Sequence, residues 1–415
     1  MFEAGYVRNL LRSDGKSPTG FWLCFGFLFL VVISLHAKPV PFGNEFIYLM
    51  RLAPYAPAGD WSFAHAANEH WLFNFIFSIP AHLVTIEVMG WAGRILVWIL
   101  CLTGLIRLGQ NWKVPYWSIA FAVSFWLAVG QAVVNAEWMI GSFEAKTVAY
   151  ACLLFALTDF ADKRLLRASI LLGLSFSFHP AVGLWAIPAV GIALLVERIA
   201  FRDLAKAAGL TFLFALPGIV PLVGDQLSAQ PARDADWQFI VVKHMPFHFD
   251  PFYFSTLGMV ILGLMLVFNV IALRGSESFA LRFLRSFQIA IAGFFLLGVL
   301  LRILELYPLL RLMPMRLFPI LTPLFFIFSA VYFVRKLDGL PKKAAALVCV
   351  LVILGLLEPF DEGIGRLREL KASWVAKPND LDVSLKWIAT NTPRDAVILA
   401  APLGREFWYL SQRSQ

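Results

Sequence analysis

The sequence predicts an all-α polytopic membrane protein, with about 11 transmembrane helices and a short α/β segment at the C-terminal end. Of its 415 residues, 60% are hydrophobic and only 15% are charged, whereas about a quarter are charged in soluble domains. Apolar runs of membrane length, roughly 17 to 25 residues, also recur along most of the chain. The net charge of +8 is expected to report orientation in a lipid bilayer, and a nucleic-acid partner is not predicted.

The predicted transmembrane domain covers residues 1–357. Its first apolar run, Phe21 to Leu35, has no small-residue cleavage site after it, which favours an uncleaved first span over a secretory signal. We expect spans near residues 20–37, 88–108, 114–131, 146–160, 166–178, 181–197, 206–223, 253–273, 286–304, 317–334 and 343–357.

The distribution of basic residues predicts the orientation. With the N-terminus in the cytoplasm, the cytoplasmic segments contain 18 of the 35 Lys and Arg residues, as the positive-inside rule requires. All seven histidines then lie on the extracytoplasmic side. This sidedness predicts that the polar chemistry is extracytoplasmic, although longer outer loops would hold more residues of every kind.

The first outer loop, residues 38–87, is long enough to predict a functional role. We expect an interfacial or re-entrant helix over Trp71 to Leu83. Glu45 and Asp60 are the candidate catalytic residues, because a carboxylate at the membrane surface can take a proton from an acceptor hydroxyl. Asp60 could equally cap a short helix that starts at Trp61.

Two candidate binding residues flank the fourth and fifth spans. Lys146 could hold a lipid phosphate as a point charge, or it could pair with Glu144 or extend from the helix end to the interface. His179 precedes Pro180, and a helix break at membrane depth is tolerated where the backbone lines a cavity. His179 is therefore a candidate for a polar pocket.

The remaining candidate residues lie in two later outer segments. His244 and His248 occur in DADWQFIVVKHMPFHFDP, where Pro246 argues against a continuous helix and therefore against a metal site. They are expected to form a polar wall that contacts a phosphate or sugar. Arg316 is the candidate ligand of a lipid phosphate, while Arg311 is expected to anchor the headgroup interface. Neither a metal nor a cofactor is predicted.

The tail, residues 358–415, contains more charges. The stretch LDVSLKWIATNTPRDAVILAAP predicts an amphipathic helix, a turn and a buried strand from Val397 to Ala400. An odd number of spans places this tail outside the cell. We expect it to be an α/β unit that belongs to a longer, incomplete domain.

The segments FEAKTVAY, LGLSFSFHPAVG, KHMPFHFDP and WIATNTPRDAVILAAP resemble an uncharacterised bacterial group within the GT-C superfamily of polyprenyl-phosphate-sugar-dependent glycosyltransferases. The resemblance implies sugar transfer from a polyprenyl-phosphate donor at the outer surface of the bacterial inner (plasma) membrane. It also implies that Glu45 or Asp60 serves as base and that Arg316 contacts the donor phosphate. The usual paired acidic motif is only Asn44-Glu45 here, and the tail lacks a WWDYG segment, so peptide glycosylation is not implied.

Two alternatives belong to other functional classes. The chain could be a transporter or flippase of lipid-linked sugars, or a non-catalytic component of an envelope polysaccharide assembly. Transporters often contain internal repeats and broken helices near the bilayer midplane. No such repeat is evident here, and the polar residues collect on one side, which favours the enzyme.

Overall fold

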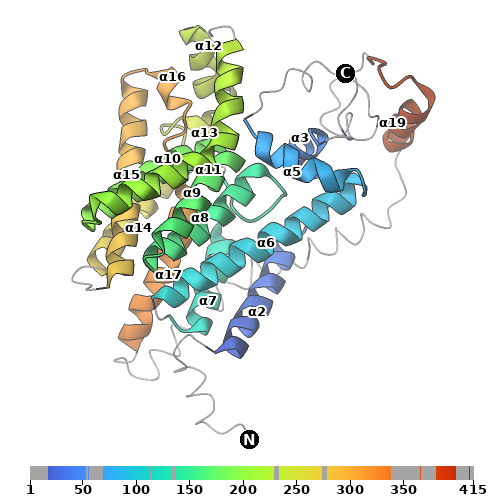
Figure 1. The fold of residues 1–415 in the computed structure, drawn as a ribbon. Coiled ribbons are helices and arrows are strands. Elements are labelled where there is room, and N and C mark those ends of the chain that lie inside the picture. Colours follow the sequence, from blue (N-terminus) through green and yellow to red (C-terminus); the bar gives the residue numbers. More distant parts are fainter. Residues whose placement is uncertain are drawn as a thin grey trace, which may run out of the picture.

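The computed structural model describes residues 17–52, 55, 69–112, 114–132, 134, 137–228, 233–272, 278–337, 365, 380–398 and 411. In these parts of the chain the regular elements are α-helices and one π-helical turn, with no strand element among them. Most of the longer helices pack side by side into a bundle (Figure 1). The all-helical prediction is therefore confirmed for the described residues.

Four of the described helices are long and apolar enough to cross a membrane. They are α2 (Pro18–His36), α6 (Ile86–Asn111), α11 (Phe201–Ser228) and α15 (Phe279–Ile303). A helix of about 20 residues spans the hydrocarbon core of a bilayer. These helices indicate a membrane-embedded protein.

Six further helices complete the described bundle. Their bounds are α7 (Tyr116–Val129), α8 (Ala145–Ala161), α9 (Leu165–Phe178), α10 (Pro180–Val196), α14 (Thr256–Ala272) and α17 (Phe318–Leu337). Helices therefore occupy ten of the eleven predicted spans, and the eleventh, 343–357, lies outside the described residues. The number of membrane crossings is not confirmed as eleven, because several of these helices are short.

Small elements gather toward the upper end of the view in Figure 1, away from the start of α2. They are α3 (Glu45–Met50), α5 (Trp71–Ala81), α12 (Asp234–Gln238), η1 (Phe239–His244), α13 (Pro246–Phe249) and α16 (Tyr307–Leu310). The helix expected over Trp71 to Leu83 is α5. Each of these elements comes from a predicted outer segment.

Local sequence signals explain where several helices begin. Ser17 caps α2 by accepting a hydrogen bond from the Gly20 amide at 3.3 Å, with Pro18 in the first turn. His179 ends α9, and Pro180 opens α10 directly after it. The break predicted at His179-Pro180 is therefore a corner between two packed helices.

Close contact between α9 and α11 depends on glycine. A Cβ atom at Gly173 would lie 2.4 Å from the backbone oxygen of Thr211, and one at Gly218 would lie 2.8 Å from Cα of Ser177. Small residues allow helix backbones to approach closely where lipid provides no hydrophobic drive for association. The Ser177 hydroxyl donates to the backbone oxygen of Phe214 at 2.6 Å, which adds a hydrogen bond between the two helices.

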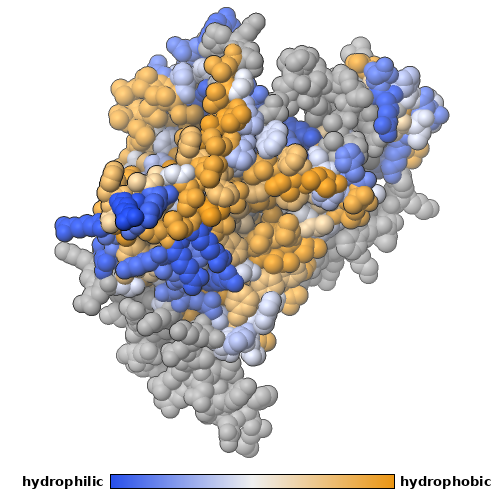
Figure 2. Space-filling model, viewed as in Figure 1, coloured by the Kyte–Doolittle hydropathy of each residue, from blue (hydrophilic) through white to orange (hydrophobic). Residues whose placement is uncertain are grey.

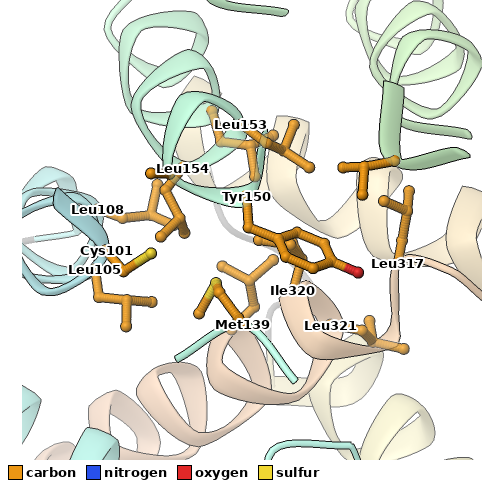
Figure 3. Close-up of a cluster of buried hydrophobic side chains, with 14 of the residues drawn as sticks. Cys101, Leu105, Leu108, Met139, Tyr150, Leu153, Leu154, Leu317, Ile320 and Leu321 are labelled. Carbon is orange, nitrogen blue, oxygen red and sulfur yellow. The ribbon is translucent and has the colours of Figure 1, made fainter. Parts of the chain in front are cut away.

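The apolar core lies where α6, α8, α17 and the 130–144 connection meet. Figure 3 shows Tyr150 of α8 among residues of all four segments, with its hydroxyl directed away from the α6 side. That hydroxyl donates to the backbone oxygen of Arg316 at 2.6 Å. The core thus connects directly to a predicted site residue. The labelled neighbours are Cys101, Leu105, Leu108, Met139, Leu153, Leu154, Leu317, Ile320 and Leu321.

The surface agrees with a lipid environment. Hydrophobic residues form a broad region across the middle of the molecule, while hydrophilic residues gather elsewhere, for example over α12 and α19 (Figure 2). Exposed apolar side chains on the long helices include Trp22 at 66%, Leu264 at 65% and Leu296 at 66%. Continuous exposure of this kind is unusual for a soluble monomer.

The tail is confirmed only in part. The amphipathic helix is α19 (Asp380–Asn391). Val397, the first residue of the expected buried strand, is 68% exposed, and residues 399 and 400 lie outside the described part. The α/β character of the tail is therefore not confirmed, since an exposed residue cannot supply the core that a strand needs.

Candidate functional site

The candidate site is built around the 130–144 connection between α7 and α8. Gln131 shapes this connection: its side-chain oxygen accepts from the amides of Met139 at 2.8 Å and Ile140 at 2.7 Å. Its backbone oxygen accepts from the Trp126 indole at 3.1 Å and from the Thr322 hydroxyl. Because buried polar groups require partners, these hydrogen bonds fix the loop against α7 and α17.

Glu137, in this loop, is fully buried and contacts three basic side chains. Arg316 donates to its Oε1 atom from the turn before α17. Lys146 Nζ lies 3.3 Å from Oε2, and His248 Nδ1 lies 2.8 Å from Oε1. Residues from four separate segments of the chain therefore meet at one carboxylate.

Lys146 also contacts Glu144 and an aromatic ring. Its Nζ atom is 3.3 Å from Glu144 Oε2 and 3.6 Å from the ring centroid of Trp138. A cation above an indole face is stabilised by the ring quadrupole. Lys146 therefore pairs with Glu144, as one of the alternatives predicted from the sequence. The pair lies inside a buried cluster that also contains Glu137.

Two histidines extend the cluster from Arg316. The second guanidinium nitrogen, Nη2, is 3.0 Å from His179 Nε2. The His179 ring stacks on the ring of His70, with centroids 4.8 Å apart, and His70 Nε2 lies 3.3 Å from the Tyr48 hydroxyl. Both histidines are buried. A continuous polar wall therefore runs from Tyr48 to Glu137.

The electrostatics of the loop carboxylates follow from these contacts. Burial alone would raise the pKa of Glu137, but Arg316, Lys146 and His248 outweigh it and hold that pKa well below its usual range. Burial raises the pKa of Glu144, and the nearby carboxylates of Glu137 and Glu45 raise it further. The Lys146 ammonium acts in the opposite direction but does not outweigh them. Glu137 is thus the stabilised anion of the pair.

Burial also lowers the pKa of His70 to about 4, with the nearby charges of Arg51 and Arg316 acting in the same direction and Glu69 opposing them. The imidazole is therefore neutral at neutral pH and can accept a hydrogen bond. Nδ1 of His70, Nδ1 of His179 and Nε of Arg316 are buried without a hydrogen-bond partner among the described residues. Such groups are costly unless a ligand or water satisfies them, which makes this wall a candidate binding site.

His248 reaches the cluster because the chain breaks at Pro246. η1 ends at His244, and Pro246 opens α13, which carries His248 inward. Asp250, which follows α13, is bound to Arg302 at 3.0 Å, so the short helix is tied to the end of α15. The prediction that Pro246 interrupts a continuous helix is confirmed.

Glu45 occupies a different position from the cluster. It is fully buried, and Arg94 of α6 donates to both of its carboxylate oxygens. The amides of Phe42 and Phe143 also donate to it, at 3.0 and 2.8 Å. This geometry favours a positioning role, because the carboxylate joins α3 and α6 to the end of the 130–144 connection.

The structure thus brings together four predicted binding residues: Lys146, His179, His248 and Arg316. His244 does not join them, because it is exposed and stacks on Phe239 with ring centroids 6.2 Å apart. Asp60 lies outside the described residues. Arg311 lies over Trp237, 4.1 Å from the ring centroid.

Sequence reasoning did not assign a role to Glu137, His70, Tyr48 or Arg94. Glu137 had a usable signal, since it shares an outer segment with Lys146. Arg94 had another, because an arginine within an apolar helix requires a buried partner. The first signal points to Lys146 but not to Arg316 or His248, and the second does not identify Glu45, because these partners come from distant segments of the chain.

No group of three or more His, Cys, Asp or Glu side chains with metal-site geometry occurs in the described ranges. A scan against known protein-family models and a search of curated proteins gave no match. The chemical interpretation therefore rests on the cluster itself. The cations Arg316 and Lys146, the carboxylates of Glu137 and Glu144, and the imidazoles of His70 and His179 can together hold an anion, orient it and accept a proton.

Proposed function

We propose that this chain is a GT-C-like membrane glycosyltransferase that moves a sugar from a polyprenyl-phosphate-linked donor to an acceptor hydroxyl at the extracytoplasmic surface. The observation that carries the proposal is the convergence of Arg316 and Lys146 on buried Glu137 at one end of an apolar helical bundle. A lipid-linked phosphate could reach such a cluster, because the hydrocarbon chain of the lipid stays in the bilayer while its phosphate headgroup lies at the membrane surface.

The charges fit this donor. Arg316 and Lys146 supply two positive charges, Glu137 offsets one, and Glu144, whose pKa burial raises, opposes Lys146 only to the extent that it is ionised. A sugar phosphodiester carries one negative charge, whereas the released phosphate monoester carries close to two. Two cations therefore stabilise the leaving group more strongly than the bound donor, which is the differential stabilisation that accelerates a reaction.

The proposed step conserves atoms and charge. The acceptor oxygen forms a bond to the anomeric carbon of the sugar. The bond between that carbon and the phosphate oxygen breaks, and its electron pair leaves with polyprenyl phosphate. The acceptor proton passes to a carboxylate base.

Glu137 is the proposed base among the described residues. A donor phosphate that binds Arg316 and Lys146 draws these cations away from Glu137, so its pKa rises toward the working pH. Asp60, in the long first outer loop, is the second candidate. His179 and His70 would orient the sugar through their unpartnered ring nitrogens.

The test is sugar transfer in proteoliposomes that contain the full chain and a radiolabelled polyprenyl-phosphate sugar, with an extract of envelope glycans and lipids as acceptor. Wild-type protein should transfer label, and Arg316→Gln should reduce transfer by roughly a hundredfold, as expected when one charge-stabilising donor is removed. Arg233→Gln, an exposed residue outside the cluster, serves as the matched control. Movement of intact donor across the bilayer without transfer would contradict the proposal and favour the transporter.

A further inference from the structure

A second feature lies away from the cluster, on the surface of the helical bundle. α10 and α11 both pack against α9 and leave between them a groove with a volume of about 590 Å³. Its base is formed by Ser169, Leu172 and Phe176 of α9. Its volume is that of a small-molecule pocket, which is roughly 300 to 1,000 Å³.

The lining of this groove offers no free polar group. Its two hydroxyl residues are already bonded: Ser169 donates to the backbone oxygen of Leu165 at 2.7 Å, and Thr211 donates to that of Ser169 at 3.3 Å. The other lining residues are apolar. An occupant that needs hydrogen bonds would lose them here, so the groove fits a hydrocarbon chain.

One end of the groove adjoins a basic surface. Exposed Arg198 lies three residues after the lining residue Leu195, and exposed Arg202 directly follows the lining residue Phe201. Exposed Lys206 follows one turn later. None of these three basic residues has an ion-pair partner among the described residues, although exposed Asp203 lies between them in the chain.

The other charges near this end are already neutralised or shared. Asp159 binds Arg164 and Arg167, at 3.7 and 2.8 Å. Glu197 binds Arg282 at 2.9 Å. Arg198, Arg202 and Lys206 outnumber Asp203, so the net charge beside the groove is positive.

We propose that this groove binds an anionic glycerophospholipid of the bilayer, with one hydrocarbon chain between α10 and α11 and its phosphate against Arg198, Arg202 and Lys206. The combination of an apolar groove and a basic rim matches the two parts of such a lipid. The site is separate from the Glu137 cluster, and it stands whether or not the chain transfers a sugar.

Native mass spectrometry of the full chain, purified in mild detergent and exchanged into nanodiscs of mixed phosphatidylglycerol and phosphatidylcholine, tests this site. Wild-type protein should retain one phosphatidylglycerol in preference to phosphatidylcholine. Replacing Arg198, Arg202 and Lys206 together by Gln should abolish that preference, since each basic residue near a membrane surface contributes about fivefold. Lys243→Gln, at an exposed basic residue elsewhere, is the control.

Filling the groove provides an independent variant. A Cβ at Gly191 meets no atom within 4 Å, so Gly191→Phe extends into the groove without disturbing the helix. Ala208→Phe fills it from α11. Both should lose the retained lipid, whereas Gly263→Phe on α14, which also has open space, should keep it. Retention by both filled variants, equal retention of the two phospholipids, or recovery of a polyprenyl phosphate instead would overturn the proposal.

Discussion

Glu137 is the residue on which the candidate site depends. It is the common partner of Arg316, Lys146 and His248, and these contacts hold its pKa well below its usual range. A carboxylate in this state keeps three basic side chains in one place before the proposed donor binds. Pre-organised charge of this kind avoids reorganisation during the reaction.

Replacing Glu137 separates binding from chemistry. Glu137→Gln keeps the shape but removes the proposed base and the negative charge, so donor affinity should be maintained or increased while the transfer rate falls by roughly a hundredfold or more. Steady-state transfer at varied donor concentration measures both quantities. Asp236→Asn, at an exposed carboxylate, should leave both unchanged. A Glu137→Gln protein with wild-type turnover would exclude Glu137 as the base.

His70 predicts a pH dependence of stability. Its pKa is about 4 when folded, against about 6.5 in an unfolded chain, so the unfolded state binds more protons between these values. Stability should therefore rise with pH through this window, and about 3 kcal/mol present at neutral pH should be lost near pH 4. The unfolding temperature in detergent should be measured at pH 4.5 and at pH 7. The difference between these two temperatures should be smaller for His70→Phe than for the wild type. His244→Phe, at an exposed histidine, is the control and should behave like the wild type. An unchanged difference in His70→Phe would contradict this assignment.

The sequence predicted individual site residues correctly where a polar or charged side chain was unusual in its apolar segment. Arg316 between two prolines, Lys146 at a helix end and His179 before Pro180 all stood out, and the structure brings them together. Glu45 also stood out, but its partner Arg94 lies in another helix. The sequence shows that a buried carboxylate needs a cation, and only the packing of α3 against α6 shows which cation is used.

At the scale of elements, two tertiary contacts hold the site. Gln131 anchors the beginning of the 130–144 connection, and Glu45 anchors its end through Phe143. Glu137 is presented between these anchors. The loop is thus positioned by side chains outside the cluster.

The Glu45–Arg94 pair gives a test of this support. Glu45→Ala leaves Arg94 buried without its carboxylate and should destabilise the protein by about 3–5 kcal/mol. Asp236→Ala breaks the exposed pair with Arg233 and should have no measurable effect. Denaturant unfolding in detergent compares the two variants, and equal stability would show that the buried pair does not hold the fold.

The α9–α11 contact provides a second test. Gly173→Leu forces a side chain against the Thr211 backbone, which cannot retreat as a flexible side chain can, so the cost should be about 1–3 kcal/mol or more. Gly263→Leu on α14, where a Cβ meets no atom within 4 Å, is the matched control. Equal unfolding temperatures for these variants would contradict close α9–α11 packing.

Hydropathy predicted the positions of most helices because a lipid-facing or core helix must be apolar along its length. It was less accurate at helix ends: α11 begins at Phe201 and α15 at Phe279, several residues before the expected spans. Basic residues such as Arg202 and Arg282 continue these helices beyond the apolar part. The short α3, α12 and α13 were not predicted, since a few residues carry little periodic signal.

At the scale of the whole molecule, the proposed topology puts the cluster and the basic groove rim toward opposite faces of the membrane. Lys243→Cys and Arg202→Cys, in a background without the native cysteines, should therefore react with a membrane-impermeant maleimide from opposite sides of oriented vesicles. Lys243→Cys should react from the extracytoplasmic side. Labelling of both from the same side would overturn the proposed topology.

The proposed function requires that the Glu137 cluster recognise a lipid-linked phosphate, and donor binding in nanodiscs measures that recognition. Wild-type protein should bind a polyprenyl-phosphate sugar at least about tenfold more tightly than the corresponding uncharged polyprenol, because charged hydrogen bonds contribute about 1.5–3 kcal/mol each. Arg316→Gln should lose most of that preference, whereas Arg233→Gln should keep it. Equal affinity of the wild-type protein for the charged and uncharged lipids would contradict the proposed function.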